Sequence, residues 1–319
     1  MSVLVYVENW NGAFKKASYE AVSYASELAS KQGTECVALV LDAKDDVAVL
    51  GKYGADKVVH VKGGFEGFNN QNHAAVINEV AGEQNASTVV VSNTNNGKMV
   101  APLVAVKQNA SIISNVIELP SSLSPLTVKR KAFSNKAFVN YSSSNANNVL
   151  SIMPNAYGIK ENAKTAQVEE SNKSAVDSKL TSVNIEQASG SIPLPEAELV
   201  VSGGRGLKGA ENWNLVEDLA GILGAGTACS KPVADMGWRP HHEHVGQTGL
   251  AINPELYIAI GISGAIQHLA GVSSSKNIVV INTDPEAPFF KAADYGIVGD
   301  AFEVLPRLTE AIKNFKAQN

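Results

Sequence analysis

The chain has 319 residues, of which 45% are hydrophobic and 18% charged, a length that suits about two domains with cores of their own. These proportions exclude a disordered, collagen-like or coiled-coil protein. The 26 basic and 31 acidic residues leave a net charge of -5, which disfavours nucleic acid and anionic membrane as partners. The 2 cysteines lack metal-ligand spacing and indicate a reducing compartment.

The first residues do not resemble a targeting segment. Residues 2–7 form an apolar run without the basic start of a signal peptide or the Arg-rich pattern of an organelle presequence. No window approaches the ~18 consecutive apolar residues that a membrane span needs. We therefore expect a cytoplasmic protein of bacterial type with no membrane span, although a mature organellar protein would have the same pattern.

The first half of the chain alternates strand-like runs with helical patterns. This alternation predicts βαβ units and a mostly parallel sheet. Beyond Leu126, three strand candidates are joined by Ser and Asn turns, and we expect them to form an antiparallel edge of that sheet. The alternating segments are 3–7, 17–29, 36–41, 47–53, 57–61, 73–81, 88–91 and 99–105, and the three later strands are 127–133, 137–142 and 148–153.

A polar, Ser-rich stretch from Asn155 to Pro195 follows, with short strand candidates at 166–169 and 182–185. We place the domain boundary within it, which gives domains 1–190 and 196–319.

A second βαβ series begins at Glu196 and favours another doubly wound α/β sheet with mostly parallel strands. A final helix, 304–317, contains Pro306 and could pack on its own sheet or on a partner. The predicted strands of this series are 199–202, 256–260 and 278–281, and the predicted helices between them are 213–223 and 265–270.

Two glycine-rich turns end strands of the second series and are candidate ligand contacts. The first, Ser202–Gly206, lets a ligand approach the backbone closely and carries Arg205, whose planar charged group suits phosphate. The second, Gly261–His268, opens a helix, so its free backbone N–H groups suit an anion, and Ser263 adds a hydroxyl. Either turn could also be a plain tight connection.

The loop between these turns contains the cluster His241–His244, which invites a metal interpretation. Adjacent residues of an extended loop point in alternate directions, and no further His or Cys with ligand spacing follows, so we expect no metal site. Gln247 and Thr248 lie between two glycines and suit short polar contacts to a heteroaromatic ring, or a polar turn.

Taken together, these motifs resemble the α subunit of electron transfer flavoprotein. The run Gly261–His268 is the most specific of them, and the others follow the family's order. The resemblance implies that the second domain is a Rossmann-like FAD-binding domain and that the first, which is similar only in its βαβ pattern and length, serves partner interaction and scaffolding. The matching runs are 201–206, 245–249, 254–259, 261–271 and 282–288.

The family's FAD contacts map onto numbered positions through this resemblance. Arg205 would lie near the pyrophosphate and the isoalloxazine, and Thr248 near the flavin N5. Residues 267–268 would lie beside the pyrimidine side of the ring, and Asn282 and Asp300 at the adenosine end. The implied cofactor-binding set is Arg205, Ser230, Lys231, Val245, Gly246, Gln247, Thr248, Ser263, Gly264, Ala265, Ile266, Gln267, His268, Asn282 and Asp300.

Position 231 departs from the family. The family usually has an arginine directly after the serine that matches Ser230, whereas Lys231 followed by Pro232 stands here. Lysine keeps the positive charge but loses the planar fork and the ability to stack. The effect on the flavin potential depends on whether Lys231 faces the ring or is turned to solvent by Pro232.

The resemblance implies an electron carrier without catalytic residues of its own, in which the cofactor does the chemistry. Paired with a β subunit, it would accept electrons from flavin dehydrogenases such as the acyl-CoA dehydrogenases of fatty acid β-oxidation. It would pass them to an acceptor such as a quinone oxidoreductase. One alternative is the α subunit of an electron-bifurcating flavoprotein that receives electrons from NADH through a β-subunit flavin, and another is a nucleotide-binding module without redox turnover.

Overall fold

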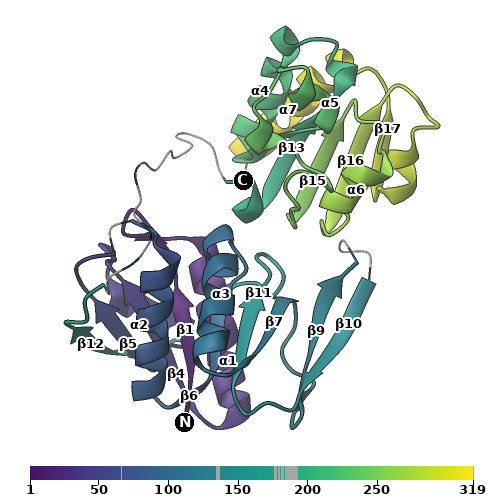
Figure 1. Ribbon diagram of the computed structural model, residues 1–319. Coiled ribbons are helices and arrows are strands. Elements are labelled where there is room, and N and C mark those ends of the chain that lie inside the picture. Colours follow the sequence, from purple (N-terminus) through teal and green to yellow (C-terminus); the bar gives the residue numbers. More distant parts are fainter. Residues whose placement is uncertain are drawn as a thin grey trace. The chain divides into compact units, whose positions relative to one another are not determined.

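A computed structural model describes residues 1–65, 67–133, 137–175, 178, 180, 183 and 193–318. The chain divides into two compact units (Figure 1): one comprises Met1–Ala132 and Phe138–Gln187, and the other comprises Phe133–Ala137 and Ala188–Asn319. Both are α/β units whose sheets are mostly parallel. Every helix in the described part of the chain is too short or too polar for a bilayer crossing.

A mixed sheet forms the centre of the first unit. Its central strands pair in parallel, and β7 pairs antiparallel with β9. The strand order is β10 (Ala137–Ser143), β9 (Leu126–Ala132), β7 (Ser111–Val116), β11 (Asn148–Ile152), β6 (Ala86–Ser92), β1 (Ser2–Val7), β4 (Glu35–Leu41), β5 (Lys57–Val61) and β12 (Gln167–Ser171), with β8 (Ser122–Leu123) beside β9 and a small hairpin of β2 (Asn9–Trp10) and β3 (Ala13–Phe14).

Helices cover both faces of this sheet (Figure 1). All six residues of β1 are buried, because alternate side chains enter separate apolar clusters on the two faces. The helix α1 (Lys16–Gln32) and the short helix η1 (Val47–Tyr53) belong to one cluster, and α2 (Asn70–Glu83) and α3 (Asn95–Lys107) belong to the other.

The structure corrects one sequence prediction in this unit. Residues 148–153 were expected at an antiparallel edge, but β11 lies inside the sheet and pairs in parallel with β6 and β7. Its residues are all buried, as a strand covered on both faces requires. The antiparallel edge consists of β9, β10 and the short β8, which pairs with β9. The predicted strand 166–169 is confirmed by β12, which pairs with β5, and the candidate 182–185 falls outside the described residues except for Val183.

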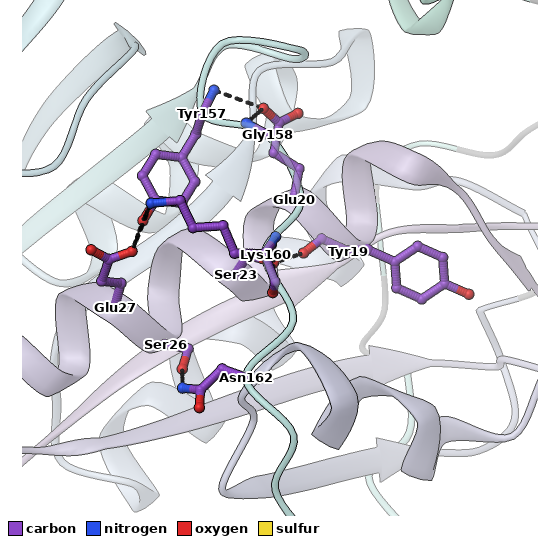
Figure 2. Close-up of polar contacts among 9 residues, drawn as sticks. All are labelled: Tyr19, Glu20, Ser23, Ser26, Glu27, Tyr157, Gly158, Lys160 and Asn162. Atoms are coloured by element: carbon purple, nitrogen blue, oxygen red, sulfur yellow. Dashed lines mark hydrogen bonds and ion pairs between the residues drawn. The ribbon is translucent and has the colours of Figure 1, made fainter.

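A buried carboxylate joins the segment after β11 to α1 (Figure 2). The Glu20 side chain is 2% exposed, and its two oxygens accept backbone N–H groups of Asn155, Tyr157 and Gly158, each at 2.8 Å. The Tyr157 hydroxyl donates to Glu27, which lowers the pKa of that carboxyl. This polar face of α1 therefore fixes the chain between β11 and β12.

The second unit has a wholly parallel sheet in the order β14 (Gly226–Cys229), β13 (Leu199–Gly203), β15 (Leu256–Ile260), β16 (Asn277–Asn282) and β17 (Tyr295–Val298). The helices α4 (Asn214–Leu223), α5 (Lys231–Asp235) and α7 (Ala301–Gln318) share one apolar cluster, and α6 (Ile266–Val272) packs on the other face. Ala301 and Leu305 of α7 are buried in the first of these clusters, so the final helix packs on its own sheet despite Pro306.

Candidate functional site

A cavity of about 710 Å³ opens at the carboxyl ends of β13, β14, β15 and β16. This is the edge at which parallel α/β sheets bind ligands, because the loops that leave the strands diverge there. The size is within the range of small-molecule sites. Its lining includes Arg205, Ser230, Lys231, Val245, Gln247, Thr248, Ser263, Ala265, Gln267, His268 and Asn282, all of which the sequence singled out.

Close backbone contact joins the two glycine-rich turns. The Gly204 N–H donates to Ile260 at 2.8 Å, and the Gly206 N–H donates to Gly261 at 3.0 Å. Gly261 has a φ of 60°, and a Cβ there would lie 2.7 Å from the Cα of Gly206. Only glycine combines this left-handed conformation with such an approach, so the glycines hold the two turns together at the cavity.

A second backbone contact brings the loop 245–248 against the start of α6. The Gln247 N–H donates to the Gln267 carbonyl at 2.7 Å, and the Val245 N–H donates to Cys229 at 3.1 Å. A Cβ on Gly271 would lie 2.5 Å from the backbone of Gly246. The Gly246 backbone therefore packs against α6, and the side chains of Val245, Gln247 and Thr248 line the cavity.

Two cations line the cavity without a protein counter-ion. Arg205 follows β13, and Lys231 begins α5 directly after β14. Within the described part of the chain, neither side chain has an ion pair or hydrogen bond, and both are exposed. Their charges are therefore available to an anionic ligand.

His268 forms a buried, neutral wall of the cavity. Its Nε2 lies 2.8 Å from the Tyr257 hydroxyl, and its Nδ1 is buried with no partner among the described residues. Burial, with a smaller effect from nearby His244, lowers the pKa of His268 to about 4. The imidazole is therefore uncharged at neutral pH, although the Val245 backbone opposes part of this shift.

The cluster His241–His244 is divided between three environments. Glu243 is buried and accepts two hydrogen bonds from Arg239, at 2.8 and 2.6 Å. His241 and His242 are exposed, whereas His244 is buried and lines the cavity. In the described ranges, no three His, Cys, Asp or Glu side chains are grouped so that they could hold a metal ion.

Four residues of the sequence-based set do not line the cavity. Gly246 and Gly264 act through the backbone, since a Cβ on Gly264 would lie 2.5 Å from Phe289. Ile266 is 62% exposed at the start of α6. Asp300 accepts the Phe302 N–H at 3.0 Å at the start of α7 and lies 3.5 Å from Lys208.

Family models match both units of the chain. Residues 3–176 match the electron transfer flavoprotein domain, and residues 193–273 match the electron transfer flavoprotein FAD-binding domain. The chain is 34% identical over 316 residues to the electron transfer flavoprotein subunit alpha of Bacillus subtilis, covering 98% of this chain and 97% of that protein. The subunit alpha of Pseudomonas aeruginosa is 36% identical, with 98% of this chain and 100% of that protein covered, and that of Syntrophomonas wolfei is also 36% identical, with 97% and 98% covered.

The chain belongs to the electron transfer flavoprotein α-subunit family. FAD is therefore the cofactor of the second unit. Among solved structures, the chain is similar to a putative thiamin diphosphate-dependent enzyme from Mycobacterium smegmatis at 11% identity, covering 97% of this chain and 59% of that one. The TM-score of 0.24 is too low for this match to bear on fold or function.

The residues present fit FAD as this family would bind it. Uncompensated cations at Arg205 and Lys231 suit a pyrophosphate, and the polar side chains of Ser263, Gln267 and Asn282 line the same cavity.

Sequence reasoning did not assign several lining residues to the site, among them His244, Ile262, Asp284 and Ala287. His244 immediately precedes the loop 245–248, and its neighbours Glu243 and Val245 are buried as well, so no alternation of exposed and buried side chains marks it in the sequence. Asp284 lies just beyond the carboxyl end of β16, where a ligand edge was to be expected.

Proposed function

We propose that this chain is the FAD-holding half of a heterodimer with an electron transfer flavoprotein β subunit. It accepts electrons from flavin dehydrogenases such as acyl-CoA dehydrogenases and delivers them to a downstream acceptor such as a quinone oxidoreductase. It transforms no substrate of its own. Family membership supports the carrier role, and the cavity of the second unit supports the location of the cofactor.

The observation that carries this proposal is the pair of uncompensated cations at the cavity. FAD, when bound, supplies one- and two-electron redox chemistry. Arg205 and Lys231 reach the cavity from the ends of adjacent strands, β13 and β14, and are free to stabilise the negative charge of a pyrophosphate or of a ring that has gained electrons. A carrier needs this stabilisation because its charge changes in each cycle.

We propose a role for each end of the cavity from the family resemblance and the cavity lining. The loop 245–248 would hold the isoalloxazine ring through Thr248, and Gln267 and His268 would contact its pyrimidine side. Asn282, whose amide nitrogen donates to the Ile262 carbonyl at 3.0 Å, lies with Asp284 at the adenosine end. Asp300 accepts the Phe302 N–H at the start of α7, and it would support the adenosine end of the cavity without lining it.

Co-expression of this chain with a β subunit tests the proposal. We expect a heterodimer by light scattering, one tightly bound FAD with a flavin absorption spectrum, and reduction of that flavin by an acyl-CoA dehydrogenase with its substrate. A chain that stays monomeric with full FAD content beside the β subunit would contradict the pairing. Reduction by NADH, with a second flavin per heterodimer, would instead identify the bifurcating form.

A further inference from the structure

The first unit has a cavity of its own, of about 630 Å³, at the carboxyl ends of β1 and β4. The chain leaves β1 for α1 on one face of the sheet, whereas β6, on the other side of β1, leads to α3 on the opposite face. The switch point of this sheet, where doubly wound sheets bind ligands, therefore lies between β1 and β6, and the cavity lies beside it, toward β4. Like the cavity of the second unit, it lies at the carboxyl edge of the parallel strands of its own sheet.

Aromatic side chains form much of its wall: Tyr6, Trp10, Phe65, Phe68 and His73. The His73 ring lies 5.6 Å from that of Phe65 and 5.0 Å from that of Phe68, measured between ring centroids. Trp10 is 43% exposed, and the Lys15 ammonium lies 4.7 Å from its ring. An aromatic wall of this kind favours a planar ring as ligand.

Two deeply buried polar groups on this wall have unused hydrogen-bonding capacity. Tyr6 is 4% exposed and His73 is 5% exposed. The Tyr6 hydroxyl has no hydrogen-bond partner among the described residues. The Nδ1 of His73 lies 2.8 Å from the Asn69 carbonyl, which can only accept, so Nδ1 carries the proton and Nε2 is left as an acceptor in the neutral ring. Burial lowers the pKa of His73 and keeps the ring neutral at pH 7.

Carboxylates occupy the positions that a phosphate would need. Glu8 accepts the Thr94 hydroxyl at 2.6 Å, and Thr94 is the N-cap of α3, so the carboxylate lies at the helix end where nucleotide-binding sheets hold phosphate. Asp42 accepts backbone N–H groups of Gly63 and Phe65 and has no ion pair in the described part of the chain. The cation in the lining, Lys44, is exposed.

We propose that this cavity binds a phosphate-free nitrogen heterocycle that carries an N–H group, of the size and chemistry of a purine nucleoside. A purine presents a ring nitrogen acceptor beside an exocyclic amino donor. These match the Tyr6 hydroxyl as donor and the His73 Nε2 as acceptor, while the aromatic rings contact its plane. Glu8 and Asp42 exclude the corresponding nucleotide by charge repulsion. The proposal does not depend on the proposed electron-transfer function.

Isothermal titration calorimetry of the FAD-loaded heterodimer with adenosine and with adenosine monophosphate tests this. We expect one adenosine per heterodimer, at least tenfold tighter binding of adenosine than of the monophosphate, and an unchanged flavin content. Tyr6→Phe keeps the ring and removes the hydroxyl, and it should weaken adenosine binding at least fivefold. The matched control Tyr53→Phe, at a half-buried tyrosine outside the lining, should match the parent.

Glu8→Gln separates exclusion of phosphate from recognition of the ring. It keeps an acceptor for Thr94 and removes the charge, so we expect the preference for adenosine over the monophosphate to shrink at least threefold. The proposal fails if adenosine gives no binding heat at millimolar concentration, if it displaces FAD, if the monophosphate binds as tightly to the parent, or if Tyr6→Phe binds adenosine as the parent does.

Discussion

Each of the two units has a cavity at the carboxyl edge of its own parallel strands, and charged side chains of opposite sign line the two cavities. Arg205 and Lys231 line the cavity of the second unit and lack protein counter-ions in the described structure. In the first unit, Glu8 and Asp42 line the corresponding position, and Glu8 reaches the end of α3 through Thr94. The fold therefore supplies the crevice twice, and the few residues that follow each strand determine what it holds.

The glycines of the second unit offer the strongest test of this comparison. Gly261→Ala places a Cβ 2.7 Å from the Cα of Gly206 at a φ of 60°, so the two turns must separate. We expect a loss of stability of about 3 kcal/mol or more and loss of FAD, because conformation and steric clash both oppose the new side chain. Urea unfolding and flavin content measure this. Gly221→Ala, in the interior of α4 with open space around it, is the control and should be neutral or stabilising.

Acid pH should weaken the second unit through His268. Its pKa in the fold is about 4, below the ordinary value of 6.5. The unfolded chain takes up a proton as the pH falls through 6.5, and the folded chain does so only near 4, so stability is complete above 6.5 and is lost between these values. The loss amounts to about 3 kcal/mol. His244 lies nearby and has a lowered pKa as well.

Urea unfolding across this pH range checks the prediction. His268→Gln should flatten the pH dependence, whereas His242→Gln, at an exposed position, should leave it unchanged. An equally steep loss of stability in the His268→Gln protein would contradict the assignment to this imidazole.

The first unit can be weakened without changing the cavity of the second unit. The two carboxylate oxygens of Glu20 accept three backbone N–H groups. Glu20→Gln leaves only one oxygen as acceptor and places an amide nitrogen, itself a donor, against the remaining N–H. We expect a loss of about 2 kcal/mol in the free energy of unfolding, as for a buried, charge-assisted group that loses an acceptor. FAD affinity should stay that of the parent. The control Glu118→Gln removes a surface ion pair with Lys129 and should cost less than about 0.5 kcal/mol.

The sequence predicted the βαβ pattern because strands buried on both faces are apolar throughout, as in Ser2–Val7. It did not predict β7 or β14, whose sequences, SIISNV and GTAC, mix small and polar residues. The predicted position of β11 was also wrong, because strand pairing depends on contacts between residues that are far apart in the sequence. Turn chemistry could suggest one edge for 127–153 but not that its last strand returns to the middle of the sheet.

Much of the lining of the second unit's cavity was predicted because glycine turns and strand ends are visible in the sequence. The family resemblance supplied the remaining positions. His244 was not, since residues 241–243 form a short 3-10 helix instead of the extended loop expected from the sequence, and no motif indicates the pair of Arg239 with Glu243 that ends it. That pair turns Glu243 into the protein, and the next residue then faces the cavity.

Removing one cation should measure how much the charge of the second cavity contributes. Arg205→Ala should weaken FAD binding by about 1.5 to 2 kcal/mol, a factor of roughly ten to thirty, because the site loses a charge-assisted contact to phosphate. Equilibrium dialysis of the heterodimer gives the affinity. Arg307→Ala on α7, an exposed arginine outside the lining, is the control and should bind FAD as the parent does. Equal affinity in both variants would place the Arg205 guanidinium away from the cofactor.

The smallest expected effect concerns Lys231, where the chain leaves its family. The ammonium lines the cavity but is exposed, so water screens it and its contribution to a negatively charged ring is up to about 1 kcal/mol. Lys231→Gln should lower the first reduction potential of the flavin by up to about 40 mV, since a one-electron potential changes by 59 mV for each tenfold change in equilibrium constant. Lys231→Arg should equal the parent or exceed it slightly, because it keeps the charge and adds a planar group. Potentiometric titration of both variants, with Lys313→Gln on α7 as the control, decides the matter. Parent-like potentials in both Lys231 variants would show that this ammonium is directed to solvent and that the difference between the two cavities comes from Arg205 alone.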